Sequence, residues 1–259
     1  MKKIIAIALT LVMALFALTS CGSDLSAVKD SGKLVVGVTV YEPMDYLDED
    51  GNWTGFDAEL AKKFAESLGV NVQIVIIDWN NKTAELDANQ IDLVWNGMTA
   101  SDELGESIDF SVSYAKNAQV AVVKKGSSIT KDMIKNATVA VENGSAGETV
   151  ARETIKVTKL VEKSDGQVGA LSEVLAETSD VAIIDMTMAE SVVGKGIYAG
   201  LEILSGAKYG EEIFAVGLRK GSDLKAELDA FLKAKYADGT MEALAEKYQV
   251  ILNTEALEG

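Results

Sequence analysis

Side chains that can hold a small polar molecule follow the apolar runs of this sequence. Tyr41 comes directly after the run 34–40, and Asp185 ends the run 181–185. The other residues at such positions are Asp45, Trp79, Trp95, Asn96, Gly97, Thr99, Ser145 and Ala146. Aromatic rings offer stacking surfaces, while hydroxyl, amide and carboxylate groups give directed hydrogen bonds, and small-molecule sites combine both. We therefore expect a binding site for a small polar ligand.

Several of these residues also have a purely structural interpretation. Trp79 can pack beneath a helix, and Trp95 fits the core or the contact between two lobes. Ser145 stands three residues before Glu148, which is the spacing of a capping box, so it is expected to cap a helix in either case. The helix N-terminus that it opens can also bind an anion. Asp185 can cap a turn or face a cation.

The composition excludes most enzyme chemistry. The chain has no histidine and one cysteine, Cys21, so a Ser-His-Asp or Cys-His nucleophile and the usual Cys/His zinc sites are excluded. We expect no catalytic residue, metal or cofactor. The formal net charge of −16 argues against a nucleic-acid partner, because such proteins need a basic face.

Strand-like and helix-like patterns alternate along the chain. Phe56, Leu60, Phe64 and Leu68 recur at four-residue spacing, which predicts an amphipathic helix over 56–68. Further helices are predicted at 83–88, 167–177, 223–235 and 241–248, with another opened by 144–148. Strands are predicted at 34–40, 72–77, 91–95, 120–123, 138–141, 181–185 and 213–218. This alternation is typical of parallel βαβ units, and its restart after 120–123 predicts two α/β lobes.

The N-terminus has the pattern of an export signal. Lys2 and Lys3 precede an apolar run, 4–18, which is too short to cross a bilayer comfortably. We predict a signal peptide over 1–20 and a small, polar tether over 21–32. Leu18-Thr19-Ser20-Cys21 resembles the bacterial lipobox, and this resemblance implies acylation of Cys21 and an extracytoplasmic, lipid-anchored protein. An ordinary cleaved signal with a chance cysteine is the alternative.

The order of short motifs resembles one protein family. The motifs are Gly32-Lys33-Leu34-Val35-Val36-Gly37-Val38, Tyr41-x-Pro43, Gly51-x-x-x-Gly55-Phe56-Asp57, Ile91-Asp92-Leu93, Gly97-Met98-Thr99, Asp109-Phe110-Ser111-x-x-Tyr114, Gly144-Ser145, Asp180 to Asp185, Ala237-Asp238-Gly239-Thr240 and Lys247-Tyr248. In this order and spacing they resemble the family 3 solute-binding proteins of polar-amino-acid ABC transporters.

The resemblance implies a two-lobed, periplasmic-binding-protein-like fold of type II. Lobe 1 would comprise 33–119 and 218–259, and lobe 2 would comprise 124–212. Two β crossovers near 120–123 and 213–217 would form the hinge. A monomer would close on its ligand in the cleft, and a membrane permease would recognise the closed form.

The resemblance also assigns roles to particular residues. It implies an aromatic platform at Tyr41 and an acidic partner for the ligand's α-ammonium at Asp185. Backbone contacts to the amino acid would come from Asn96, Gly97 and Thr99, and amides for its carboxylate would come from Ser145 and Ala146.

One departure from the family pattern affects the expected ligand. The family usually has an arginine for the α-carboxylate where this chain has Leu104, and neither Arg152 nor Arg219 is an obvious substitute. A leucine cannot make the bidentate contact of a guanidinium. Either backbone amides and hydroxyls hold the carboxylate, or the ligand has none. An amine or betaine would then be held by Asp185, Asp45 and the aromatic residues.

Three functions are open at this point. The first is capture of an amino acid or related amine-bearing molecule for an ABC importer. The second is a sensory lipoprotein that binds a ligand without a transporter. The third is an enzyme on the same fold, similar to the dehydratases of prephenate-like acids, and the lack of a histidine and of the family arginine argues against it.

Overall fold

The computed structural model describes residues 23–259. The predicted signal peptide, 1–20, and the predicted acylation site, Cys21, lie outside the described residues. Within the described part, no helix combines the length and the apolar character that crossing a membrane requires.

The first lobe is built on a mixed sheet of five strands. Their order is β4 (Asn71–Ile76), β1 (Lys33–Val38), β5 (Leu93–Val94), β12 (Gly217–Arg219) and β6 (Ile108–Phe110). β1 pairs in parallel with β4 and β5, as the βαβ pattern predicts, whereas β12 runs antiparallel to β5 and β6. A short hairpin of β2 (Tyr46–Leu47) and β3 (Trp53–Thr54) accompanies this sheet.

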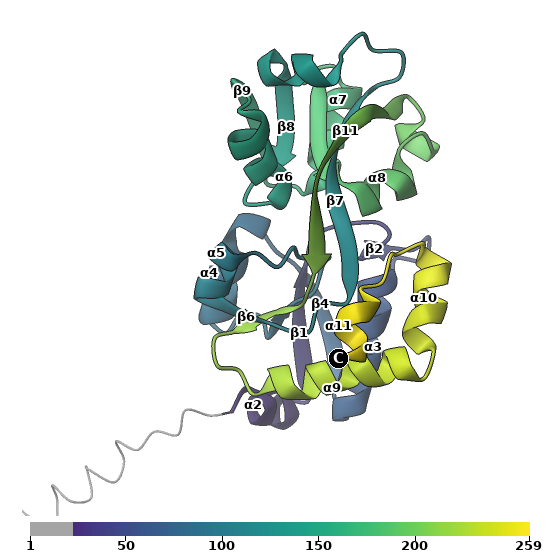
Figure 1. The fold of residues 1–259 in the computed structure, drawn as a ribbon. Coiled ribbons are helices and arrows are strands. Elements are labelled where there is room, and N and C mark those ends of the chain that lie inside the picture. The colour runs from purple at the N-terminus through teal and green to yellow at the C-terminus, as the bar shows by residue number, and fades with distance from the viewer. Residues whose placement is uncertain (1–22) are drawn as a thin grey trace, which may run out of the picture.

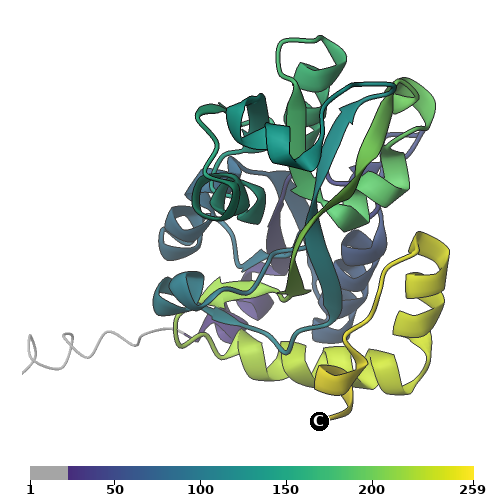
Figure 2. The same ribbon diagram turned by 45° about the horizontal axis from the view of Figure 1, so that its top comes forward.

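Helix α3 (Phe56–Leu68) shows why the predicted amphipathic helix forms. Phe56, Leu60 and Phe64 are fully buried against the core, and Gly69 ends the helix in the left-handed conformation with φ 75°. A residue with a Cβ is disfavoured at such a position. The other helices of this lobe are α2 (Asp24–Ser31), α4 (Lys82–Asp87), α5 (Asp102–Ser107), α9 (Leu224–Ala237), α10 (Thr240–Tyr248) and α11 (Thr254–Glu258). Figure 2 shows α9 to α11 along the outer edge of the lobe.

The second lobe has its own five-stranded sheet. The order is β11 (Leu201–Phe214), β7 (Ala115–Lys124), β10 (Val181–Asp185), β8 (Thr138–Glu142) and β9 (Lys159–Lys163). Its α-helices are α6 (Ala146–Thr149), continued by a π-helix (Val150–Ile155), then α7 (Gln167–Leu175) and α8 (Met186–Val192), and two short 3₁₀ helices cover Lys131–Asn136 and Gly196–Tyr198. β10 and β8 are parallel neighbours, so the residues that end them lie at one edge of the sheet.

The chain crosses between the sheets twice. One crossing lies between the end of β6 and the start of β7, and the other lies between the end of β11 and the start of β12. β7 and β11 pair antiparallel and run side by side from the second lobe toward the first (Figure 1). This confirms the predicted two-lobed α/β architecture with two β crossovers. Residues 120–123, predicted near a crossing, pair with β10 inside the second sheet.

The segment predicted as a tether contains a folded helix. Residues 24–31 form α2, Val28 is only 1% exposed, and Gly32 ends the helix with φ 68°. The sequence is mostly polar here because only one side of this short helix meets the core. The predicted tether is therefore wrong for 24–31, which belong structurally to the first lobe.

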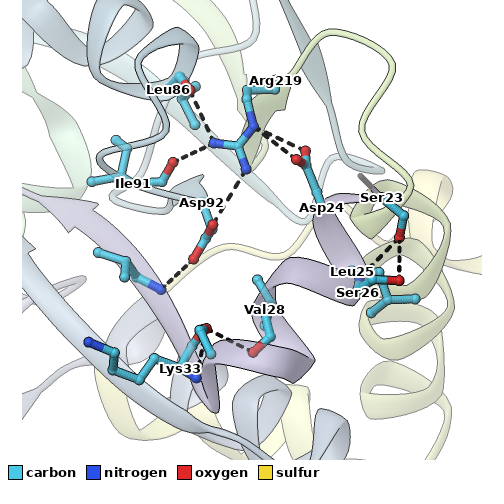
Figure 3. Close-up of polar contacts among 12 residues, drawn as sticks. Ser23, Asp24, Leu25, Ser26, Val28, Lys33, Leu86, Ile91, Asp92 and Arg219 are labelled. Carbon is cyan, nitrogen blue, oxygen red and sulfur yellow. Dashed lines mark hydrogen bonds and ion pairs between the residues drawn. The ribbon is translucent and has the colours of Figure 1, made fainter. Parts of the chain in front are cut away.

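Arg219 connects α2 to the rest of the lobe (Figure 3). Its Nε donates to both carboxylate oxygens of Asp24, at 3.2 and 3.1 Å, and its Nη1 donates to the carbonyls of Leu86 and Ile91, at 3.0 and 2.6 Å. Its Nη2 lies 3.4 Å from Asp92 Oδ1. The Arg219 side chain is 12% exposed, so these charges interact with little screening by solvent.

Candidate functional site

A cleft of about 560 Å³ is lined by residues of both lobes. The predicted residues that line it are Tyr41, Trp79, Asn96, Gly97, Thr99, Leu104, Ser145, Ala146 and Asp185. They come together because strands of both sheets end at the cleft, which is the usual position of a ligand in open α/β sheets.

Two predicted residues lie behind the cleft. Asp45 is buried and accepts a hydrogen bond from Asn96 Nδ2 at 2.8 Å, so it positions Asn96 instead of lining the cleft. Burial raises the pKa of Asp45 well above its usual value. Trp95 is fully buried and packs its ring against Phe64 and Tyr114, with centroids 6.3 and 6.5 Å apart, in agreement with its core interpretation.

Three side-chain amides hold the carboxylate of Asp185 in the second lobe. Asn117 Nδ2 and Gln119 Nε2 donate to Oδ1 at 2.5 and 2.6 Å, and Gln167 Nε2 donates to Oδ2. Asp185 is 6% exposed, and no lysine or arginine among residues 23–259 forms an ion pair with it. Burial, followed by the negative charge of Glu212, raises the pKa of Asp185 to about 7. The cleft therefore presents a well-oriented carboxylate without a countercharge.

Glu212 places a second carboxylate beside the first. It comes from the long strand β11, and its Oε2 accepts hydrogen bonds at 3.0 Å from Thr99 Oγ1, Asn117 Nδ2 and Gln119 Nε2. Asn117 and Gln119 are two residues apart on β7, so their side chains point to the same face of the strand. Sequence reasoning missed Glu212, Asn117 and Gln119, although the two amides in the otherwise apolar stretch 117–123 were a visible signal.

Tyr41 is held in place by close contacts on the first-lobe side. Its ring meets the ring of Phe214 edge to face, with centroids 6.5 Å apart at 86°. Gly97 has φ 55°, and a Cβ at this position would lie 2.7 Å from the Tyr41 ring. The backbone N–H of Gly97 donates to Asp57 Oδ2 at 2.7 Å, so that donor is already used within the protein.

The Ser145 turn forms the opposite wall. Ser145 Oγ accepts from Glu148 N at 3.2 Å, which confirms the predicted cap, and Glu148 Oε2 accepts from Gly144 N at 2.7 Å.

Arg152 reaches the rim of the cleft, but it is paired with both Glu148 and Glu162, and its side chain is 51% exposed. Leu104 lines the cleft as an apolar group.

Lys82 joins the two lobes across the cleft, a contact that sequence reasoning also missed. Its Nζ donates to the carbonyl of Gly144 in the second lobe at 2.9 Å and to that of Trp79 in its own lobe at 3.1 Å. Nζ also lies 4.9 Å from the centroid of the Trp79 ring. Burial lowers the pKa of Lys82 to about 8, while nearby Glu142 and Glu148 oppose this shift. This contact links the two walls of the cleft.

Replacing Lys82 by methionine is expected to weaken ligand binding by about 10- to 100-fold. The methionine keeps the apolar stem but loses the interlobe hydrogen bond, and hydrogen bonds to charged groups contribute about 1.5–3 kcal/mol. This loss favours the open form, so the ligand must supply more of the free energy of closure. Isothermal titration calorimetry measures the change in Kd. A K82M variant with the parent's Kd would show that this contact contributes nothing to closure.

Two α/β lobes joined by two crossings around a polar cleft define a two-lobed solute-binding protein with the type II fold. The chain belongs to the bacterial extracellular solute-binding proteins, family 3, whose model matches residues 34–250. This confirms the family resemblance. The family consists of binding proteins and not of enzymes, which confirms the prediction that the chain is not an enzyme. Its extracellular character agrees with the predicted extracytoplasmic location.

Individual relatives cover most of the chain. It is 34% identical over 244 residues to the arginine-binding extracellular protein ArtP of Bacillus subtilis (strain 168), covering 90% of this chain and 92% of that protein. It is 32% identical over 230 residues to the L-cystine-binding protein TcyJ of Escherichia coli (strain K12), covering 86% and 85%. The crystal structure of the P235GK mutant of ArgBP from T. maritima superposes with a TM-score of 0.80 at 30% identity, covering 87% of this chain and 98% of that one.

Proposed function

We propose that this protein captures an amino acid in the cleft between its lobes and delivers it to an ABC uptake transporter. The observation that carries this proposal is the buried carboxylate of Asp185, which three amides orient and with which no lysine or arginine of residues 23–259 forms an ion pair. A buried carboxylate without a countercharge is costly, and an α-ammonium group would supply that charge. The relatives named for arginine and L-cystine support the amino-acid class.

The remaining parts of the ligand would contact the walls around Asp185. Tyr41 and Trp79 provide apolar faces for its side chain, and the turn at Ser145 and Ala146 provides amides for its carboxylate. The closed form would dock on a membrane permease, and acylation of Cys21 would keep the protein at the outer face of the membrane.

A matched ligand panel tests this proposal. Each common L-amino acid is compared with its N-acetyl and carboxamide derivatives by thermal shift and then by calorimetry. We expect at least one free amino acid to raise the melting temperature, since a ligand that binds only the native state stabilises it. We expect its N-acetyl derivative to have no effect, because acetylation removes the ammonium. Amino-acid capture is excluded if no free amino acid binds.

The carboxamide derivative decides between the two alternatives that Leu104 leaves open. If the carboxamide binds much more weakly than the free amino acid, the carboxylate is recognised without the family arginine. If the two bind equally, the carboxylate is not recognised, and amines and betaines become the better ligand class.

A further inference from the structure

Glu142 is a second buried carboxyl group in the wall of the cleft. It ends β8, next to the end of β10 where Asp185 lies, and both side chains line the cleft. Glu142 is 3% exposed, and its Oε1 has no hydrogen-bond partner among the described residues. A buried polar atom without a partner is rare and costs free energy. This oxygen therefore indicates a ligand group that donates a hydrogen bond to it.

We propose that Glu142 anchors a second cationic group of the ligand, so that the protein selects amino acids with a positively charged side chain. This inference rests on the proposed function: Asp185 would take the α-ammonium group, and Glu142 would take the ammonium or guanidinium group at the other end. Glu142 is thus a specificity-determining residue for the side chain of the ligand.

Within residues 23–259, no donor hydrogen-bonds Glu142 Oε1. Lys82 is the nearest cation, but its Nζ donates to the carbonyls of Trp79 and Gly144, and within residues 23–259 no ion pair joins it to Glu142. The hydroxyl of Thr39, which lies beside Glu142 near Gly166, donates to Asn96 Oδ1 at 2.9 Å. A ligand group can therefore supply the donor that Glu142 Oε1 lacks.

The charge balance of the cleft favours a cation over a neutral donor. The lining holds six carboxyl groups and two cations, Lys82 and Arg152; the carboxyl groups are those of Glu103, Glu142, Glu148, Glu153, Asp185 and Glu212. Burial, followed by the negative charge of Asp185, raises the pKa of Glu142 to about 8, while Lys82 and the Thr39 hydroxyl lower it and Asp78 raises it further. A cation held at Glu142 would stabilise the carboxylate and release its proton near neutral pH.

Matched pairs of ligands test the role of Glu142. The pairs are L-arginine with L-citrulline and L-lysine with L-norleucine, whose members differ mainly in the side-chain charge. Calorimetry should show that the parent protein binds at least one cationic member about 30-fold or more tightly than its neutral counterpart, as expected for a buried charge pair. In Glu142→Gln this preference should fall to about threefold or less, while the Kd for the neutral member changes little.

A control variant and a second measurement separate this role from a change in net charge or in folding. Glu246→Gln removes one charge from an exposed position on α10, outside the cleft lining, and should keep the parent's preference. The second measurement uses the parent protein alone. Calorimetry at pH 7, repeated in buffers of different ionisation enthalpy, gives the number of protons released when the ligand binds. Binding of the cationic member should release more protons than binding of the neutral member.

The outcomes distinguish this inference from the proposed function. Equal affinity of the parent for both members of each pair overturns the role of Glu142, as does a retained preference in Glu142→Gln or equal proton release. Tight binding of neutral amino acids only would also overturn it and would leave the proposed function intact. If no amino acid of any charge binds, the proposed function itself is wrong.

Discussion

Replacing Asp185 by asparagine is expected to weaken ligand binding by about 30-fold to about 4000-fold. Loss of one partner from a buried, hydrogen-bonded charge pair costs about 2–5 kcal/mol, and about 1.4 kcal/mol corresponds to a factor of ten. Asparagine has nearly the same shape, but it replaces one accepting oxygen by an NH₂ donor, so the loss would reflect the missing charge together with one lost hydrogen bond from the surrounding amides. Calorimetric titration of the parent and of Asp185→Asn with the same amino acid measures the change.

The same substitution should reduce the loss of stability that the ligand-free protein undergoes as the pH rises toward neutral. The pKa of Asp185 in the folded protein is about 7, above the ordinary value of 3.8. The folded state therefore binds the proton more tightly than the unfolded state, and ionisation destabilises the fold progressively as the pH rises from about 4 to about 7. Asparagine cannot ionise, so the variant should lose less stability than the parent between pH 5 and pH 8 in urea unfolding.

Asp87→Asn is the matched control for Asp185→Asn, because it makes the same change of charge at an exposed residue at the end of α4. It should leave both the Kd and the pH profile unchanged. Unaltered ligand affinity in Asp185→Asn would show that Asp185 is not the partner of the α-ammonium group.

Local patterns were sufficient to predict the two lobes. The spacing of Phe56, Leu60 and Phe64 predicted α3, and the spacing of Ser145 and Glu148 predicted the observed cap, because each depends on neighbours in the sequence. The run 213–218 was predicted as one strand, but the structure divides it between β11 and β12, which belong to different sheets. Pairing partners far away in the chain decide that division, and a local apolar pattern does not contain them.

The same limit explains which residues of the site were missed. Tyr41 and Asp185, which both line the cleft, were predicted because they directly follow or end apolar runs. Glu212 lies in a polar stretch of β11, and Lys82 begins a helix, so neither position is distinctive in the sequence. Their importance arises from partners in the other half of the fold: Glu212 accepts from Thr99 Oγ1, and Lys82 donates to the carbonyl of Gly144.

Long-range pairing also explains why Asp45 was predicted in the cleft but lies behind it. Its position after the first strand is typical of a ligand contact. However, the turn that follows Tyr41 directs the Asp45 carboxylate to the side chain of Asn96, 51 residues further along. Asp45 is thus a buried carboxyl group that contacts the cleft lining through Asn96.

Replacing Arg219 by methionine is expected to lower the free energy of unfolding by about 3–5 kcal/mol, the usual cost of removing one partner from a buried ion pair. The substitution leaves the carboxylate of Asp24 and the carbonyls of Leu86 and Ile91 without their shared donor. For a protein of this size the melting temperature should fall by about 10 °C. Differential scanning calorimetry of the ligand-free protein measures it.

The other arginine of the described residues provides the control for this prediction. Arg152 also has two acidic partners, but its side chain is 51% exposed, whereas that of Arg219 is 12% exposed. Solvent-exposed ion pairs contribute about 0–1 kcal/mol, so Arg152→Met should change the melting temperature by about 3 °C or less. Equal effects of the two substitutions would contradict the structural argument, because the two sites differ mainly in burial and in the backbone carbonyls that only Arg219 contacts. A larger loss in Arg219→Met would show that α2 is held to the first lobe by this guanidinium group.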